Sequence, residues 1–165
     1  MSAITGQRQS PQPRETVTPV VRNDDWWPDV DMVLLRESVR LPGNVTDKRL
    51  VFETKRALRA VNNELAQWKI KRKSEGCTTL AGVPLPAGED NPELLAGYYQ
   101  DAIFSHVDAK LCERYRNTDT TGAGDKRADM VDPRITEALR DKHLAVSGIL
   151  GYDMPSHLTV TVELI

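Results

Sequence analysis

The sequence predicts an all-α protein: a four-helix domain with an extended N-terminal arm and a strand-like C-terminal tail. Three observations support this class. Apolar residues recur at three- and four-residue steps through several long segments, and residues that begin and end helices stand at the borders of those segments. The final residues alternate between apolar and polar side chains, which is typical of a strand. We therefore place the arm at residues 1–25, the helical domain at 26–151 and the tail at 152–165.

The composition limits the classes of function. A chain of 165 residues suffices for one compact domain with appended arms. Its apolar share of 39% is low for a globular domain, which suggests surfaces that partners bury. A formal charge of −2 gives no electrostatic case for wrapping nucleic acid. Neither a run of about 20 apolar residues nor an apolar signal region occurs, so we expect a soluble protein made in the cytoplasm without membrane contact.

The first predicted helix spans about residues 30–40. Asp29 or Asp31 can cap its N-terminus, and Pro42-Gly43-Asn44 ends it. Its apolar side comprises Val30, Val33, Leu34 and Val39. The arm before it carries three prolines among polar residues, so it cannot bury enough apolar surface to become ordered alone.

Three longer helices are predicted near residues 46–75, 92–116 and 133–151. Thr46 caps the first of them, and Gly76 stops it after a run of basic residues. Pro92 stands in the first turn of the second. Asp132-Pro133 forms a cap and first-turn pair for the third, which Gly151 closes.

A glycine loop at residues 119–125, D-T-T-G-A-G-D, resembles the signature of ribokinase-type sugar kinases. In that family the glycines bind the transferring phosphoryl group at a helix N-terminus, and the last Asp is the general base. The surroundings differ here, because a helical pattern precedes the loop and the charged residues Lys126, Arg127 and Asp129 follow it. We therefore interpret this segment as a connecting loop and keep a sugar kinase only as a remote alternative.

No other arrangement of side chains points to catalysis. His106, His143 and His157 are far apart and lack metal-type spacing. Cys77 and Cys112 are too few for a disulfide framework or a metal cluster. We expect no catalytic residue, no cofactor and no metal, and hence a protein that is not an enzyme.

The tail is the part of the sequence that most strongly indicates an assembly. A single strand on a helical domain has no partner strand in its own chain, so it must pack on a helix or pair with another chain. One of its faces is apolar and comprises Leu158, Val160, Val162 and Leu164. We expect these residues, together with Trp26 and Trp27 at the opening of the folded domain, to bind partners.

Two neighbouring helices carry opposite charge. Residues 47–75 contain nine Lys and Arg against four Asp and Glu, whereas residues 89–113 contain six acids against one base. Such helices can pair within a domain or across neighbouring subunits of a ring. The basic end of the first, Lys69, Lys71, Arg72 and Lys73, can also contact phosphate, so a DNA-terminus-binding packaging accessory protein is the alternative function.

Several motifs occur in one order across residues 25–150. They are W-W-P-D-V-D at 26–31, V-N-N-E at 61–64 with Leu65 and Trp68, G-C-T-T-L-A-G-V-P at 76–84, Tyr98-Tyr99, E-R-Y-R-N-T-D at 113–119 and G-D-K-R-A-D at 124–129. In their order and spacing they resemble the head completion (head stabilisation) proteins of peduovirus-type, contractile-tailed phages.

The resemblance implies a structural role in the virion at the head–tail junction. Such proteins form a ring beneath the dodecameric portal after DNA packaging, stabilise the filled head and enable tail attachment. The implied partners are the portal protein ring, neighbouring copies in a dodecameric ring and a tail-side connector or terminator protein. Packaged DNA passing through the lumen is a further expected contact, and assembly takes place in the host cytoplasm.

Overall fold

The computed structural model describes residues 20–39, 41, 45–85, 89–116 and 122–151, and for residues 115–116 and 122–132 it describes only the backbone. Residues 1–19 of the predicted arm lie outside the described residues. So do Pro42-Gly43-Asn44 and the whole predicted tail, including Leu158, Val160, Val162 and Leu164. The predicted tail strand therefore stays a prediction.

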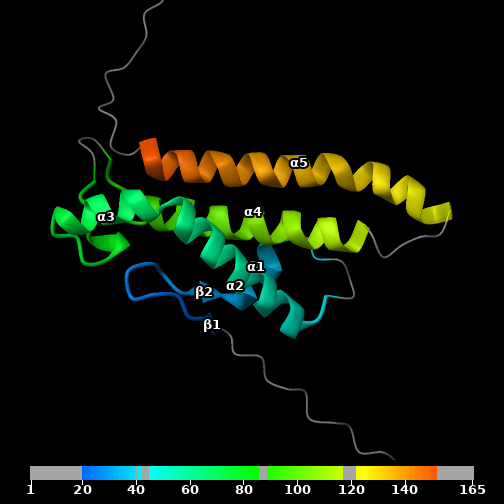
Figure 1. The fold of residues 1–165 in the computed structure, drawn as a ribbon, viewed down its shortest axis with the longest axis horizontal. Helices are drawn as coiled ribbons and strands as arrows, with labels where there is room; N and C mark the ends of the chain where they lie inside the picture. Colours follow the sequence, from blue (N-terminus) through cyan, green and yellow to red (C-terminus); the bar gives the residue numbers. More distant parts are fainter. Residues whose placement is uncertain (1–19, 40, 42–44, 86–88, 117–121, 152–165) are drawn as a thin grey trace, which may run out of the picture.

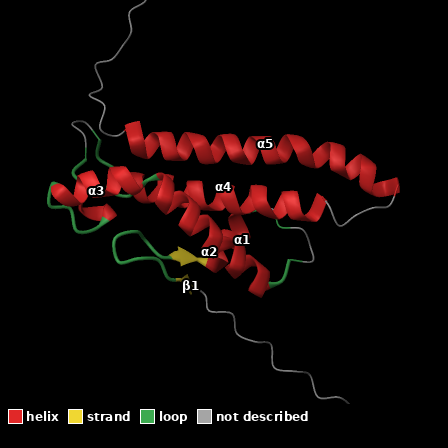
Figure 2. Ribbon diagram, in the orientation of Figure 1, coloured by secondary structure: helices red, strands yellow, loops and turns green. Residues whose placement is uncertain are grey.

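Helices dominate the described part of the chain (Figure 2). The elements in order are β1 (Val20–Val21), β2 (Val30–Asp31), α1 (Met32–Ser38), α2 (Asp47–Glu64), α3 (Ala66–Ser74), the 3₁₀ turn η1 (Leu80–Gly82), α4 (Leu94–Arg116) and α5 (Gly122–Gly151). The mostly helical class is confirmed. The described residues form five α-helices rather than four, because the helix predicted at 46–75 is interrupted.

The interruption lies at Leu65, which separates α2 from α3. The Leu65 N–H still bonds to the Val61 carbonyl, and the Lys69 N–H bonds to the Leu65 carbonyl, each across 3.0 Å. Both predicted ends of the segment at 46–75, the cap at Thr46 and the stop at Gly76, are confirmed. The Thr46 hydroxyl accepts the Arg49 N–H, and Gly76 adopts a φ of 95°, which favours glycine. The Cys77 N–H then bonds to the Arg72 carbonyl and satisfies the end of α3.

Helix α1 is shorter than predicted and buries a different face. Asp31 caps it, since its carboxylate accepts the N–H groups of Val33 and Leu34 at 2.7 and 3.1 Å. The prediction that the side chains of Val33 and Leu34 face the core is wrong, because they are 54% and 42% exposed. A helix of seven residues presents a narrow face, and here that face is occupied by Met32 and Leu35.

The folded part begins earlier in the chain than predicted. Val21 pairs with Val30 and Val20 with Asp31 in an antiparallel ladder, and Val21 is buried. Residues 20–25 therefore belong to the folded body rather than to the arm. Val30, predicted in the first helix, lies in strand β2 instead.

Helix α4 is the centre of the molecule (Figure 1). Helix α5 runs antiparallel along it, and α2 packs against it as well. Because neighbours surround it, α4 contributes buried side chains on several sides, among them Tyr99, Ala102, Ile103 and Phe104. Helix α5 buries a narrower strip made of small and branched residues, Ala138, Ala145, Val146 and Ile149.

The prediction that residues 119–125 form a loop and that Pro133 begins the last helix is wrong for its described part. Helix α5 begins at Gly122 and contains Pro133. A proline inside a helix removes one intrahelical N–H donor and usually bends the helix at that point. In Figure 1 the first part of α5, drawn in yellow, bends away from the axis of the remainder.

Candidate functional site

A cluster of four aromatic side chains, which we call the aromatic anchor, joins the N-terminal segment to two helices, α3 and α4. It comprises Trp26, Trp27, Trp68 and Tyr99. Trp27 stacks on Tyr99 with the ring centroids 4.6 Å apart and meets Trp26 edge to face at the same distance. Trp26 and Trp27 are only 5% and 3% exposed. Both indoles, predicted to bind partners, are therefore occupied inside their own chain.

Polar groups at the edge of the anchor complete the connection. The Tyr99 hydroxyl donates to Asn62 Oδ1 at 2.5 Å and accepts from Asn23 Nδ2 at 2.7 Å. The Asn62 amide donates in turn to Asn23 Oδ1 at 2.9 Å. Burial raises the pKa of Tyr99 well above its ordinary value, so the phenol stays protonated and serves as a structural donor.

The loop after α3 is tied to the same anchor. Trp26 Nε1 donates to the Cys77 carbonyl at 3.2 Å, and the Leu80 N–H bonds to the Trp26 carbonyl at 3.0 Å. The motifs at 26–31, 61–64, 76–84 and 98–99 thus meet at one place in the fold. Their shared role is to fix the N-terminal segment and this loop against α2, α3 and α4.

The basic run at the end of α3 is only partly available to a ligand. Lys69 forms an ion pair with Asp24, and its Nζ lies 5.4 Å from the centroid of the Trp26 ring. Arg72 pairs with Glu75 at 2.6 Å and lies 5.3 Å from the Trp68 ring. Lys71 and Lys73 are exposed. The four residues predicted to face DNA therefore do not form one cationic surface, because two of them cover the anchor.

A different basic surface lies on α2. We call it the α2 stripe, and it comprises Phe52, Lys55, Arg56 and Arg59. The Phe52 ring is 53% exposed, and the Arg56 guanidinium lies 5.6 Å from its centroid. Among the described residues, no carboxylate pairs with Lys55 or Arg59. These residues lie opposite the buried Leu50, Ala57 and Val61, a spacing that the helical periodicity of the sequence contains but from which we did not predict a surface.

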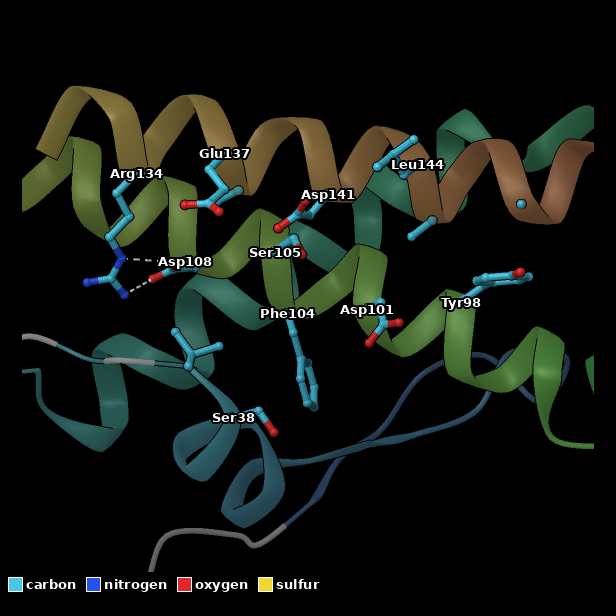
Figure 3. A pocket seen from close by; sticks show the side chains of 14 residues that line it. Ser38, Tyr98, Asp101, Phe104, Ser105, Asp108, Arg134, Glu137, Asp141 and Leu144 are labelled. Atoms are coloured by element: carbon cyan, nitrogen blue, oxygen red, sulfur yellow. Dashed lines mark hydrogen bonds and ion pairs between the residues drawn. The ribbon is translucent and has the colours of Figure 1, made fainter.

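On another face, an open groove of about 880 Å³ lies between α4 and α5 and reaches the end of α1. Figure 3 shows Glu137 and Asp141 projecting from α5 toward α4. Asp101 and Asp108 line the groove from α4. We call this the α4–α5 groove. Its floor includes the buried side chains of Phe104, Ala138 and Ala145, whereas Leu144 stands at its edge and is 63% exposed.

The groove carries more negative than positive charge. Four carboxylates and the single guanidinium of Arg134 line it, a net charge of −3. Arg134 is held by Asp108, with Nη2 and Nε at 2.5 and 3.2 Å from the two carboxylate oxygens. Partial burial, and then the nearby charge of Asp141, raises the pKa of Asp101. The groove thus holds carboxylates that repel one another.

Two side chains of types common in catalysis, Cys112 and His106, have pKa values that burial shifts. Burial, and then the nearby Asp108, raises the pKa of the Cys112 thiol to about 11, so it is not a thiolate at neutral pH. Burial, followed by the charges of Lys142 and Lys110, lowers the pKa of His106. Within the described part of the chain, no three His, Cys, Asp or Glu side chains converge as metal ligands. Nor is any described helix long and apolar enough to span a membrane.

Comparison with known proteins identifies the family. The model of the phage head completion protein (GPL) family matches residues 21–165. The head completion/stabilization protein of Escherichia phage P2 is 36% identical over 133 residues, which cover 81% of this chain and 78% of that protein. No solved structure matches. The matched residues include the aromatic anchor, the α2 stripe and the α4–α5 groove. On this evidence the chain belongs to the phage head completion protein (GPL) family.

Proposed function

We propose that this head completion protein acts as a ring adaptor beneath the portal of a DNA-filled phage head. Family membership gives the role in head completion and places the protein in the virion. The ring, its expected twelve copies, the contact with the portal and the attachment of a tail-side protein are our proposal. The observation that carries it is the presence of oppositely charged surfaces, the α2 stripe and the α4–α5 groove, on one subunit.

The proposed role is structural rather than enzymatic. The motif that resembles a sugar-kinase loop overlaps the first residues of α5, and the described part of the chain contains only a two-stranded ladder. A ribokinase-type enzyme instead requires an α/β domain. A test is ATP turnover stimulated by sugars: we expect none. Turnover that disappears in Asp125→Ala would restore the kinase alternative.

We propose that the tail supplies the portal contact. Burying the apolar face of Leu158, Val160, Val162 and Leu164 contributes roughly 1.5–3 kcal/mol for each residue before the costs of association. Deleting residues 155–165 should leave the helix content unchanged by circular dichroism and abolish attachment to the portal. Unchanged attachment would move the docking surface to the helices.

The decisive experiment uses filled phage heads assembled without this protein. We expect that adding the purified full chain prevents loss of DNA from the heads and restores joining to tails. Electron microscopy of the same heads should show a ring of added density below the portal. Heads that retain DNA and accept tails without the protein would contradict the proposed function.

Binding to a DNA terminus remains the second candidate function. The α2 stripe is a better candidate for the DNA-binding surface than the predicted basic run at Lys69, Lys71, Arg72 and Lys73. Three exposed cations lie on the same face of α2 as an exposed aromatic ring, and Arg56 lies over that ring, an arrangement suited to phosphate and base contact. This candidate predicts salt-dependent binding of a short duplex that Arg56→Glu/Arg59→Glu removes. The Lys71→Glu/Lys73→Glu variant reports whether the exposed part of the originally predicted cluster contributes.

A further inference from the structure

The two helices of opposite charge do not neutralise each other within the subunit. The ion pair that joins α2 to α4 has the reverse sense: Arg114 of α4 lies 3.0 Å from the buried Glu53 of α2. The basic residues of the α2 stripe instead face solvent, and the carboxylates of α4 line the groove. One subunit therefore presents a surface of charge +3 and a groove of net charge −3 at separate places.

We propose that the α2 stripe of one copy docks in the α4–α5 groove of the next copy, which makes a head-to-tail contact between subunits. This inference rests on the proposed ring, and it names the two surfaces that build it. Lys55, Arg56 and Arg59 would face the carboxylates of Asp101, Glu137 and Asp141.

The apolar parts of the two surfaces match as well. Phe52 is 53% exposed at one end of the stripe, and Leu144, which lines the groove, is 63% exposed. An exposed aromatic ring on the same helix face as three cations complements an open groove that both apolar and acidic side chains line. The volume of about 880 Å³ accommodates a phenyl ring and the stems of neighbouring arginines.

The positions of the surfaces permit both contacts at once. Asp101, Ser105 and Asp108 follow one another at four- and three-residue steps along one side of α4. Tyr99 and Arg114 leave α4 on another side, where they contact Asn62 and Glu53 of α2. The stripe points away from α4, because the opposite face of α2 is buried. A subunit can therefore fill one groove while its own groove receives a neighbour.

Two different surfaces in contact make a heterologous interface, and such an interface closes into a ring when the rotation between copies allows it. Charge complementarity also fixes the register and steers encounter between copies. A second copy explains both surfaces, whereas DNA would explain the stripe and leave the acidic groove without a partner.

The test uses charge reversal on the full chain. Variant S carries Arg56→Glu/Arg59→Glu and variant G carries Glu137→Arg/Asp141→Arg. Self-association is measured by sedimentation equilibrium, and contact sites by carbodiimide cross-linking of mixed ¹⁴N and ¹⁵N chains. Arg140→Glu and Asp90→Arg, at exposed positions outside both surfaces, are the matched controls. Circular dichroism verifies folding, and Phe52→Ser provides a second stripe variant without charge reversal.

We expect variants S and G each to associate with themselves at least about tenfold more weakly than the wild type. An equimolar mixture of S and G should recover association, because each stripe then meets a groove of opposite charge. Lys55 should cross-link to Glu137 or Asp141 between isotopically different wild-type chains. Phe52→Ser should weaken association, and both controls should behave as the wild type.

Three results would overturn the inference: no inter-chain cross-link from Lys55 in the wild type, wild-type association in S and G, or no recovery in their mixture. If variant S loses binding to a DNA duplex while variant G associates and binds as the wild type does, the stripe would be assigned to DNA instead. Head completion is measured for every variant in parallel. Variants that complete heads without this contact refute the interface alone, whereas wild-type protein that does not complete heads refutes the proposed function.

Discussion

Trp27 stacks on Tyr99 with an interplanar angle of 11°, and this contact binds the N-terminal segment to the central helix α4. Trp27 is 3% exposed and Tyr99 is 1% exposed. The contact links residues that are far apart in the sequence, and the hydrogen bonds of Asn23 and Asn62 surround it. Four of the six motifs that carry the family resemblance, those at 26–31, 61–64, 76–84 and 98–99, meet at this anchor.

Truncating Trp27 should destabilise the whole domain. We expect Trp27→Ala to lower the free energy of unfolding by about 3–5 kcal/mol, because it removes a buried aromatic ring and leaves a cavity between Trp68 and Tyr99. Urea denaturation followed by circular dichroism measures the loss. The control is Val33→Ala, at a side chain that is 54% exposed, which should stay within about 0.5 kcal/mol of the wild type. Equal effects of the two substitutions would contradict the buried position of Trp27.

Removing the Tyr99 hydroxyl should cost less but remain measurable. Tyr99→Phe keeps the stacked ring and leaves the Asn62 and Asn23 amides without their shared partner. We expect a loss of about 1–3 kcal/mol, the usual cost of an unsatisfied buried polar group. The neighbouring Tyr98→Phe is the control, since Tyr98 is only partly buried and lines the open groove. A neutral Tyr99→Phe would show that water or a rearranged amide replaces the phenol.

Replacing Gly76 and Gly97 by alanine should change the stability of the protein in opposite directions. Gly76 has a φ of 95°, so Gly76→Ala forces an L residue into the left-handed region and should destabilise by about 1 kcal/mol or more. Gly97 lies inside α4 with open space around it, so Gly97→Ala should stabilise by about 0.5–1 kcal/mol through helix propensity. Thermal unfolding of both variants checks the signs, and an equal sign at the two sites would refute the assignment of Gly76 as the helix stop.

Local signals explain most of what the sequence predicted correctly. Asp31, Thr46 and Gly76 act within one turn of their own helix, so their roles follow from side-chain chemistry and backbone preference alone. The break at Leu65 lacks such a signal, because neither proline nor glycine stands there and the apolar spacing continues. Tertiary packing decides it.

Other features that the sequence did not predict also depend on the folded chain. Pro133 satisfies the rule for a first-turn residue, yet α5 extends through it. Lys69 and Arg72 look like solvent-facing cations in the sequence, and only the folded chain brings Asp24 and the Trp26 and Trp68 rings beside them. The α4–α5 groove likewise depends on the pairing of residues such as Asp108 and Arg134, which no local pattern reveals.

The partial burial of Asp101, together with its repulsion by Asp141, should make the stability of the isolated protein depend on pH. The pKa of Asp101 is raised in the folded state above its ordinary value of 3.8, so the folded protein holds this proton more tightly than the unfolded chain. Its ionisation therefore lowers stability as the pH rises through the folded pKa, and the loss is complete at neutral pH. Glu137 and Asp108 face the same groove, and Arg134 is paired with Asp108.

We consequently expect Asp101→Asn to unfold at a higher temperature than the wild type at pH 7. The difference should narrow as the pH falls through the folded pKa of Asp101 and vanish below the unfolded pKa, where the carboxyl group is protonated in both states. Asp90→Asn, at an exposed position outside the groove, is the control for removing one carboxylate. A stabilisation that persists at low pH would assign the effect to packing or local backbone preference. In a ring whose grooves receive the cations of a neighbour, the same substitution should instead weaken assembly, because it removes one attractive charge at each contact.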